Sequence, residues 1–424
     1  MNNKCSYTST SICGGGSGII FESLQSLTIK NSQFSNNKAN VSLSSGDPNE
    51  EGKGGGFYFK YQAALTIENC SFNYNIADRE GGGLAIEQVE SCNIYNCTFS
   101  SNKAGQQDYG NSTHNNKQGG ALYLRNENDG VPIYVTNCTF SGNNGDGNGH
   151  GLCISGPYTV VIVSGECIFS GNAETTGSQI IVTNNANLYF NESTIMSPNQ
   201  TVRAIETSSD AQINVEGIHF TDIFTNEQNN EFTNDMKDGN AILIHEDSGL
   251  ATISHNVFFD CYRENKNSFI ISCYGPSMKL DSNIFNFSEG NGCSCVLVYN
   301  NPSSSTPANI SIINNQFLNV DSRHETISNS NPYSALYVHR TQSVTNIENN
   351  TFEQCDGSSA TTAACFYLHM YDGTDLNFNN NHIQNNHPRF SYIGEMNIHD
   401  FTSGSPFTFD HNEFISNEFQ ATTG

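Results

Sequence analysis

The chain has 424 residues, with 17 lysines and arginines against 42 acidic residues and a formal net charge of −25. An acidic chain of this kind excludes nucleic acid and anionic membrane surfaces as partners. No run of about 18 apolar residues occurs, so we expect no membrane insertion by this segment. The start, Met1–Ser6, lacks the apolar core of a signal peptide. We therefore expect this sequence to be part of a larger exported protein, or a chain without its leader and anchor.

A repeating unit begins near Gly14 and recurs along the chain. In its clearest copies, a glycine pair precedes a short strand of alternating apolar and polar residues. A second such strand ends at an asparagine, just before a phenylalanine and one more asparagine. These copies cover residues 56–75, 83–102 and 119–143. Period-two patterning over a few residues predicts strands, and no pattern of helical length is present.

The units align on the apolar residue that follows the second strand. The thirteen anchors are Phe34, Phe72, Phe99, Phe140, Phe169, Ile195, Phe220, Phe258, Phe285, Phe317, Phe352, Ile383 and Phe414. Three short strands per unit and polar corners predict one right-handed parallel β-helix, all-β, with about thirteen coils over residues 1–424. The repeats are strongest over 14–172 and degenerate over 195–352.

Stacked coils place equivalent residues on top of one another. The anchor phenylalanines should therefore form an internal ladder. One corner is expected to hold asparagines that are left-handed and bond through their amides to the coils above and below. These are Asn31, Asn69, Asn96, Asn137, Asn314 and Asn349. Extra residues fall mainly at 38–53, 103–118 and 225–238, and insertions on one side of a solenoid predict the binding face.

The glycine strand Gly119-Gly120-Ala121-Leu122 and the Phe-x-x-Asn motif resemble the two repeat motifs of the polymorphic outer membrane proteins. The second motif stands at Phe34/Asn37, Phe72/Asn75, Phe99/Asn102, Phe140/Asn143, Phe169/Asn172 and Phe414/Asn417. The resemblance implies a right-handed parallel β-helix that is displayed at the cell surface and used in adhesion. It implies neither a secretion route nor an anchor for this chain.

Four cysteines, Cys70, Cys97, Cys138 and Cys167, each stand two residues before an anchor in successive coils. They should form one column. Either disulfides join neighbouring coils, as suits an oxidising exterior, or the column consists of small buried thiols. The bridging geometry between in-register strands favours free thiols.

His150 lies in a Gly-His-Gly sequence that resembles a motif of polygalacturonases, which are β-helices too. Those enzymes also use aspartates from preceding motifs, whereas Asp235 and Asp238 follow the histidine here. The three residues are weak catalytic candidates, and His150 is equally explained as replacing one glycine of the repeat.

Two columns should face outward from the first strand, because residues between its inward positions point to the other side. One holds Tyr58, Tyr123, Tyr337 and Tyr367, which are candidate ligand-binding residues. The other ends in His339, His369 and His399, each separated by 30 residues. Stacked imidazoles are candidates for zinc binding or a pH-sensitive patch, and the stripe could instead be a platform for glycans or a partner protein.

Of the Asn-x-Ser/Thr sequences, Asn40, Asn111, Asn199 and Asn309 lie in or near expected loops and are candidate glycosylation sites. We expect no cofactor. The favoured function is a non-enzymatic cell-surface or secreted protein that contacts a host-cell or matrix protein, or a glycan, through one loop side. The alternatives are a polysaccharide lyase or glycoside hydrolase on the same fold, and a structural spacer.

Overall fold

The structure is a computed structural model. It describes residues 20–21, 26–40, 52–60, 64–105, 118–126, 131–145, 149–172, 177–196, 203–221, 223–225, 239–263, 269–287, 294–299, 308–320, 334–340, 343–356, 363–370, 374–388, 392–398 and 406–418. The chain divides into two compact units: unit 1 comprises 1–206 and 210–212, and unit 2 comprises 207–209 and 213–424. The described residues form strands and no helix, and thus contain no helix able to cross a membrane.

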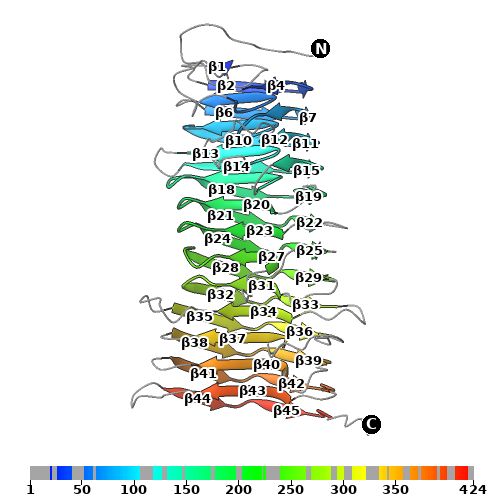
Figure 1. Cartoon of the computed structure of the whole chain (residues 1–424), viewed down its shortest axis with the longest axis vertical. Coiled ribbons are helices and arrows are strands. Elements are labelled where there is room, and N and C mark those ends of the chain that lie inside the picture. Colours follow the sequence, from blue (N-terminus) through cyan, green and yellow to red (C-terminus); the bar gives the residue numbers. More distant parts are fainter. Residues whose placement is uncertain are drawn as a thin grey trace. The chain divides into compact units, whose positions relative to one another are not determined.

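Unit 1 has three long parallel sheets and a fourth short one (Figure 1). The first sheet contains β1 (Ile20–Phe21), β5 (Phe57–Lys60), β9 (Leu84–Glu87), β13 (Leu122–Arg125), β17 (Leu152–Ser155), β20 (Ser178–Thr183) and β23 (Arg203–Thr207). The second contains β2 (Ser26–Lys30), β6 (Ala64–Glu68), β10 (Ser91–Tyr95), β14 (Pro132–Thr136), β18 (Val160–Ser164) and β21 (Asn187–Asn191). The third contains β3 (Gln33–Ser35), β7 (Ser71–Asn73), β11 (Thr98–Ser100), β15 (Thr139–Ser141), β19 (Ile168–Ser170) and β22 (Thr194–Met196). The fourth contains β4 (Lys38–Ala39), β8 (Ile76–Ala77), β12 (Lys103–Ala104) and β16 (Asn144–Gly145).

Unit 2 repeats the same plan. Its first sheet contains β27 (Gly239–Ile244), β31 (Phe269–Cys273), β34 (Ser294–Tyr299), β37 (Leu336–Arg340), β40 (Ala363–Met370) and β43 (Tyr392–Ile398). Its second contains β24 (Gln212–Glu216), β28 (Leu250–Ser254), β32 (Ser277–Asp281), β35 (Ala308–Ile313), β38 (Ser343–Glu348), β41 (Asp375–Asn379) and β44 (Phe407–Asp410). Its third contains β25 (His219–Thr221), β29 (Val257–Phe259), β33 (Ile284–Asn286), β36 (Gln316–Leu318), β39 (Thr351–Glu353), β42 (His382–Gln384) and β45 (Glu413–Ile415). A short pair is formed by β26 (Phe224–Thr225) and β30 (Tyr262–Arg263).

Neighbouring strands pair in parallel with equivalent residues in register, as in Phe72↔Phe99↔Phe140. Each coil of the chain therefore contributes one strand to each of three sheets, which is the architecture of a parallel β-helix. The predicted phenylalanine ladder is confirmed within each unit. Ring centroids of Phe72 and Phe99 lie 4.9 Å apart, and those of Phe258 and Phe285 lie 4.7 Å apart, with nearly parallel planes.

The glycine pairs allow the chain to fold tightly before each first-sheet strand of unit 1. Gly54, Gly81, Gly119 and Gly149 all have positive φ, between 61° and 71°. The glycine after each turn packs against backbone: a Cβ on Gly82 would lie 2.2 Å from the Gly120 carbonyl oxygen and 2.4 Å from that of Lys103. The chain thus passes over the outer face of the first sheet, where a Cβ on Gly81 would lie 2.8 Å from that of Ala85.

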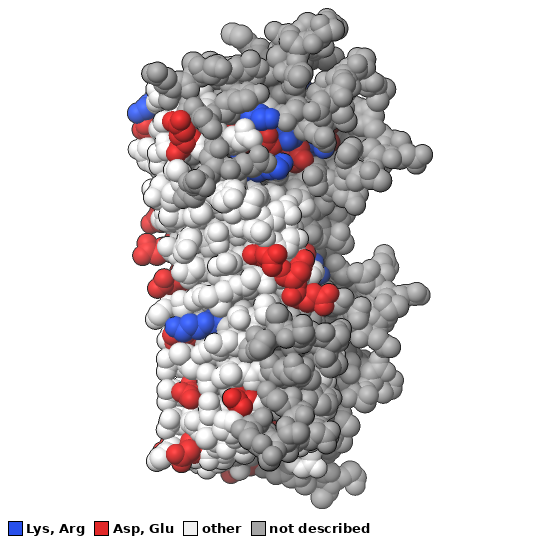
Figure 2. All heavy atoms as spheres, turned by 90° about the vertical axis from the view of Figure 1, so that its left-hand side faces the viewer, with Lys and Arg blue, Asp and Glu red and all other residues white. Residues whose placement is uncertain are grey.

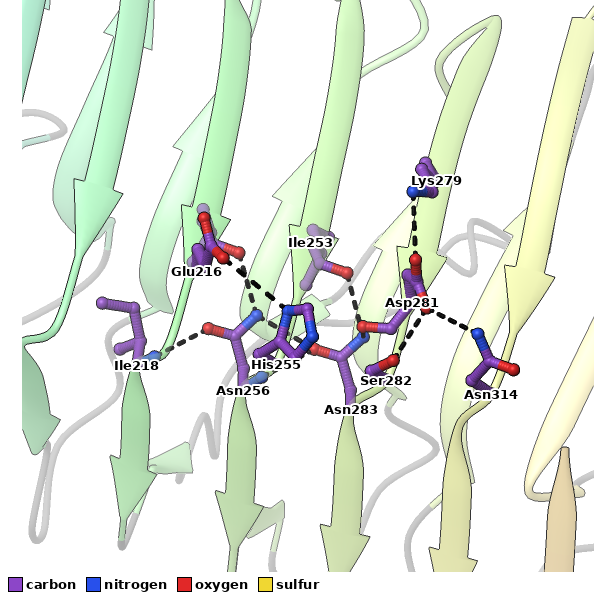
Figure 3. A network of polar contacts seen from close by, with 11 residues as sticks. Glu216, Ile218, Ile253, His255, Asn256, Lys279, Asp281, Ser282, Asn283 and Asn314 are labelled. Carbon is purple, nitrogen blue, oxygen red and sulfur yellow. Dashed lines mark hydrogen bonds and ion pairs between the residues drawn. The ribbon is translucent and has the colours of Figure 1, made fainter.

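Two different corners carry amide ladders. In unit 1, the ladder is the asparagine of Phe-x-x-Asn: Asn37, Asn75, Asn102, Asn143 and Asn172. In unit 2, the longer ladder lies two residues before the anchor, and one further pair, Asn386 and Asn417, bonds at the Phe-x-x-Asn position. The members of the longer ladder are Asn256, Asn283, Asn315, Asn350, Asn381 and Asn412. Along each ladder, Nδ2 of one asparagine donates to Oδ1 of the next. From the second rung onward each Nδ2 also donates to a backbone carbonyl of the coil on the other side, as Asn283 does to Ile253 at 2.9 Å (Figure 3).

The corner predicted to hold the ladder is different. Its six asparagines are left-handed as predicted, with φ between 51° and 58°. They are exposed, however, and within the described residues one amide-to-amide bond joins two of them, Asn69 Nδ2 to Asn31 Oδ1 at 3.4 Å. The amide ladder was therefore assigned to the wrong asparagines, because a residue in the αL turn points its side chain away from the core.

Candidate functional site

The outer face of the first sheet in unit 2 gathers aromatic and polar side chains that are half-buried. We call this set the aromatic platform; its members are Tyr274, Tyr299, His339, Tyr367, His369, Glu395 and Asn397. They come from the residue after β31 and from β34, β37, β40 and β43, and these five are consecutive strands of one sheet. Adjacent strands lie about 4.8 Å apart, so five strands span roughly 19 Å. A chain molecule fits this length better than a single small ligand.

Strand register aligns the platform in two columns. Tyr299, His339, His369 and Asn397 are register partners in succession. Tyr337, Tyr367 and Glu395 are partners in the second column, with the buried Tyr337 beneath the surface. The Tyr337 and Tyr367 rings stack at 5.2 Å and 3°, which covers the face between them.

The rings of the first column are tilted against one another. Tyr274 and Tyr299 are 5.9 Å apart at 56°, and Tyr299 and His339 are 4.8 Å apart at 46°. Tilted rings do not cover each other's faces fully, so part of the π surface is available to a ligand. This distinguishes Tyr274 and Tyr299 from the stacked pair.

Polar groups meet the aromatic rings at the β43 end of the platform. Asn397 Nδ2 donates to Tyr367 Oη at 3.1 Å and to Glu395 Oε1 at 2.8 Å. Tyr337 Oη and His339 Nδ1 are 3.4 Å apart. Burial, together with the neighbouring His369, lowers the pKa of His339 to about 4. The imidazole is therefore neutral at physiological pH and offers hydrogen bonds without charge.

The predicted histidine column is correct for two members and wrong for the third. His339 and His369 are register partners with centroids 4.8 Å apart. The partner of His369 on the next strand is Asn397, and His399 lies outside the described residues. Between β40 and β43 the register pairs residues 29 apart at Ala363 and, after a shift, 28 apart from Phe366 onward, so this coil is shorter than the 30-residue spacing of the histidines. In the described part of the chain no three His, Cys, Asp or Glu side chains are grouped to hold a metal ion. Zinc binding by this column remains a prediction without a third ligand.

The tyrosine column is buried where exposure was expected. Tyr58, Tyr123 and Tyr337 are 2%, 5% and 3% exposed, and only Tyr367 is half-buried. In unit 1, Tyr58 and Tyr123 pack in a cluster with Ala85, Cys153 and Ile181 on the outer side of the first sheet. The physical reason is the glycine turn, which brings the preceding segment back over this face. Binding by Tyr58 and Tyr123 would need that segment to move.

Unit 1 also buries a group of charged residues under the same turn. Lys53 Nζ lies 2.6 Å from Glu87 Oε1 and 4.0 Å from Glu80 Oε2, and Tyr58 Oη donates to Glu87 Oε2 at 2.8 Å. Arg79 Nε lies 3.9 Å from Glu80 Oε2. We call Lys53, Tyr58, Glu80 and Glu87 the buried ionic cluster. The repeat pattern does not predict this cluster, because Lys53 and Glu80 belong to the turn and not to the strands.

Of the three weak catalytic candidates, the structure describes His150 alone. His150 is 1% exposed, and its Nδ1 accepts a hydrogen bond from the Gly145 amide at 2.9 Å. Its own backbone continues the coil pairing, so it occupies a glycine position of the repeat. Asp235 and Asp238 lie outside the described residues, as does most of each predicted insertion.

The four cysteines of the column are buried free thiols. Each Sγ contacts a carbonyl of its own coil, as Cys138 does with Thr136 at 3.2 Å. Hydrogen bonding with Cys138 lowers the pKa of Cys97 and Cys167, and the same contacts raise that of Cys138. The column occupies in unit 1 the corner position that the amide ladder occupies in unit 2.

The corner of unit 2 also carries exposed polar contacts. Burial acts to raise the pKa of Asp281, but hydrogen bonds from Asn314, Lys279 and Ser282 outweigh it and hold that pKa below the usual value. His255 Nδ1 and Glu216 Oε1 lie 3.8 Å apart nearby (Figure 3). The Asn314–Asp281 and His255–Glu216 contacts join adjacent coils, and we assign them to stability.

Two glycosylation candidates are accessible. Asn40 is exposed after β4, and Asn309 is exposed although it lies within strand β35 and not in a loop. Asn111 and Asn199 lie outside the described residues. Glycosylation remains a prediction at all four.

Comparison with known proteins supports the architecture. Residues 1–122 match the family model described as a right handed beta helix region. The fold is a right-handed parallel β-helix. No curated protein and no solved structure matches this β-helix significantly, so its function is argued from its own residues.

Proposed function

We propose that this β-helix is a non-enzymatic protein of the cell surface or extracellular space that binds glycans through the aromatic platform. The carrying observation is the combination of tilted aromatic rings with an amide and a carboxylate on one half-buried face. Aromatic faces stack on the apolar faces of sugar rings, while Asn, Glu and imidazole groups suit ring hydroxyls. The resemblance to polymorphic outer membrane protein repeats supports the surface location.

A contact role is favoured over catalysis by the state of the candidate catalytic groups. His150 is held inside the coil, and the carboxylates of the buried ionic cluster are 2–4% exposed. A polysaccharide cannot reach groups so deeply covered. The platform, in contrast, is partly open and runs along successive coils.

The test is a glycan array with the full chain, followed by calorimetry on the strongest ligand. Tyr299→Ala should weaken binding roughly tenfold, which corresponds to about 1.4 kcal/mol. Asn397→Ala should weaken it as well. The matched control is Tyr189→Ala, which removes a tyrosine that is 43% exposed on β21 of unit 1.

Absence of any glycan ligand, or an equal loss in the control, would overturn the proposal. If the chain instead binds a protein, and Tyr299→Ala abolishes that binding, the platform is a protein-binding surface and the glycan role is rejected. Release of reducing ends or unsaturated products from polysaccharides would favour the enzymatic alternative.

A further inference from the structure

The buried ionic cluster brings an amine and a carboxyl group together in the covered outer layer of unit 1. The Lys53 side chain is 5% exposed and that of Glu87 is 6% exposed, and Nζ lies 2.6 Å from Oε1. Lys53 precedes β5 and Glu87 ends β9, which are neighbouring strands. At this distance Nζ is close to the carboxyl carbon, and near-attack geometries have reacting atoms about 3–3.5 Å apart.

A third group completes the arrangement. The Glu80 side chain is 3% exposed, and its Oε2 lies 4.0 Å from the same Nζ without a hydrogen-bond partner in the described structure. Burial raises the pKa of Glu80, although Lys53 and Arg79 act to lower it. Glu80 therefore keeps its proton more readily than an exposed glutamate and can exchange it with neighbouring groups.

The fourth group is Tyr58, whose hydroxyl donates to Glu87 Oε2 at 2.8 Å. A donor on this oxygen polarises the carboxyl group and stabilises negative charge that develops there during attack. The cluster thus contains a nucleophile, an electrophile, an oxyanion donor and a proton relay in reach of one another.

We propose that Lys53 and Glu87 condense to form an isopeptide bond that links two neighbouring coils. In the first step a proton moves from the Lys53 ammonium to the Glu87 carboxylate along the 2.6 Å contact between Nζ and Oε1, which leaves an uncharged amine beside a carboxylic acid. Nζ then attacks Cδ of Glu87, and the oxyanion is held by Tyr58.

The reaction balances without an oxidant or cofactor. Glu80 gives its proton to the departing hydroxyl and takes one from Nζ, so it ends in its starting state. One C–N bond forms, one C–O bond breaks, and one water leaves. The product is an amide between Lys53 Nζ and Glu87 Cδ.

A second lysine–glutamate pair in the same unit provides the internal control. Lys30 Nζ lies 2.5 Å from Glu68 Oε2, but the two side chains are 51% and 19% exposed. Water solvates this pair, and it has no buried third carboxyl group beside it in the described structure. We expect it to remain an ordinary ion pair.

The test is the intact mass of the full chain under denaturing conditions, followed by a tryptic peptide map. We expect a mass lower than the sequence mass by one water, no cleavage after Lys53, and a branched peptide joining Lys53 and Glu87. Cleavage after Lys30 should be normal.

Variants locate the chemistry. Lys53→Met and Glu87→Ala should each restore the full mass, and Glu80→Gln should leave most of the chain uncrosslinked because it cannot relay the proton. Glu90→Ala, which changes an exposed carboxylate close by in the sequence, should keep the water loss. A full wild-type mass with cleavage after Lys53, or a water loss mapped to another site, would overturn the proposal whether or not the variants fold.

Discussion

At the scale of single residues, Asn102 shows what one rung of the amide ladder contributes. Its Oδ1 accepts from the Asn75 amide and side chain at 3.0 Å, and its Nδ2 donates to Phe72 O at 2.8 Å and Asn143 Oδ1 at 2.9 Å. Asn102→Ala leaves a buried amide and a buried carbonyl without these partners, at about 1–3 kcal/mol each. We expect the free energy of unfolding of unit 1 to fall by about 3 kcal/mol or more in urea titrations followed by circular dichroism.

The control for this prediction is an asparagine of the same coil that carries no ladder. Asn96 is exposed with φ of 53°, and glycine adopts this conformation without strain. Asn96→Gly should change the unfolding free energy by less than about 0.5 kcal/mol. Similar losses for the two variants would mean that the ladder is not the source of stability.

His339 allows a pH-dependent prediction on the platform. Its pKa is lowered to about 4 by burial and by His369, against a usual value of 6.5. A base whose folded pKa is lowered contributes stability that is present above pH 6.5 and is lost as the pH falls toward 4. NMR titration should place the His339 midpoint near 4, and His339→Gln should flatten the loss of stability in this window. A midpoint near 6.5 would show an exposed imidazole.

The asparagines show which features of a corner can be predicted from the sequence and which cannot. Repetition identified both asparagine positions, and the left-handed backbone at Asn31 and its equivalents could be predicted because asparagine tolerates it. Which of the two points inward depends on the local turn, since the residue in αL projects outward. Periodicity alone does not contain that information.

At the scale of elements, the glycine turn before each first-sheet strand sets which side chains are covered. Gly82→Ala places a Cβ 2.2 Å from the Gly120 carbonyl oxygen and 2.4 Å from that of Lys103, and neither backbone atom can move alone. We expect a destabilisation of about 3 kcal/mol or more, beyond the usual overpacking range. Urea unfolding measures it.

Gly171 allows the cost of a left-handed backbone to be measured without the cost of a steric clash. Gly171 has φ of 60° and open space around the position of a Cβ. Gly171→Ala should cost only about 1–2 kcal/mol, the penalty of a left-handed alanine. If Gly82→Ala lowered the free energy of unfolding less than Gly171→Ala, close backbone contact would not be the reason for a glycine at position 82.

The same turns explain why part of the candidate site was missed. The strand pattern correctly placed Tyr58, Tyr123 and Tyr337 on the side opposite the core, but it did not predict that a layer covers them. Likewise, the 30-residue spacing predicts that His369 pairs with His399, whereas this coil is two residues shorter at that point and pairs His369 with Asn397. The alternation of apolar and polar residues determines on which side of the strand a side chain lies. The number of residues in the coil determines which residue of the next strand lies beside it.

At the scale of the whole molecule, the repeat was sufficient for the fold class. Anchor residues at a regular spacing cannot bury their side chains except against the next coil, and this requirement predicts parallel in-register sheets. The function is less constrained, because the platform residues Tyr274, Tyr299 and Glu395 stand outside the repeat motif. Coil stacking brings them together, and no local pattern marks them.

If the platform binds glycans as proposed, the net charge of the protein limits which glycans it can bind. With a net charge of −25, the protein repels polyanions at long range. On the face in Figure 2 the described surface is mostly uncharged, with scattered acidic groups and fewer basic ones. Glu395 adds a carboxylate to the platform itself, while the neutral His339 offers no compensating positive charge. We therefore expect neutral glycans to bind better than their sulfated forms.

Neutral ligands should show less than about a twofold change in affinity between 0.05 and about 0.5 M NaCl, because no ion pair is screened. A steep fall with salt in calorimetric titrations would show instead that binding depends on charge, and the stacking account of Tyr274 and Tyr299 would then be wrong.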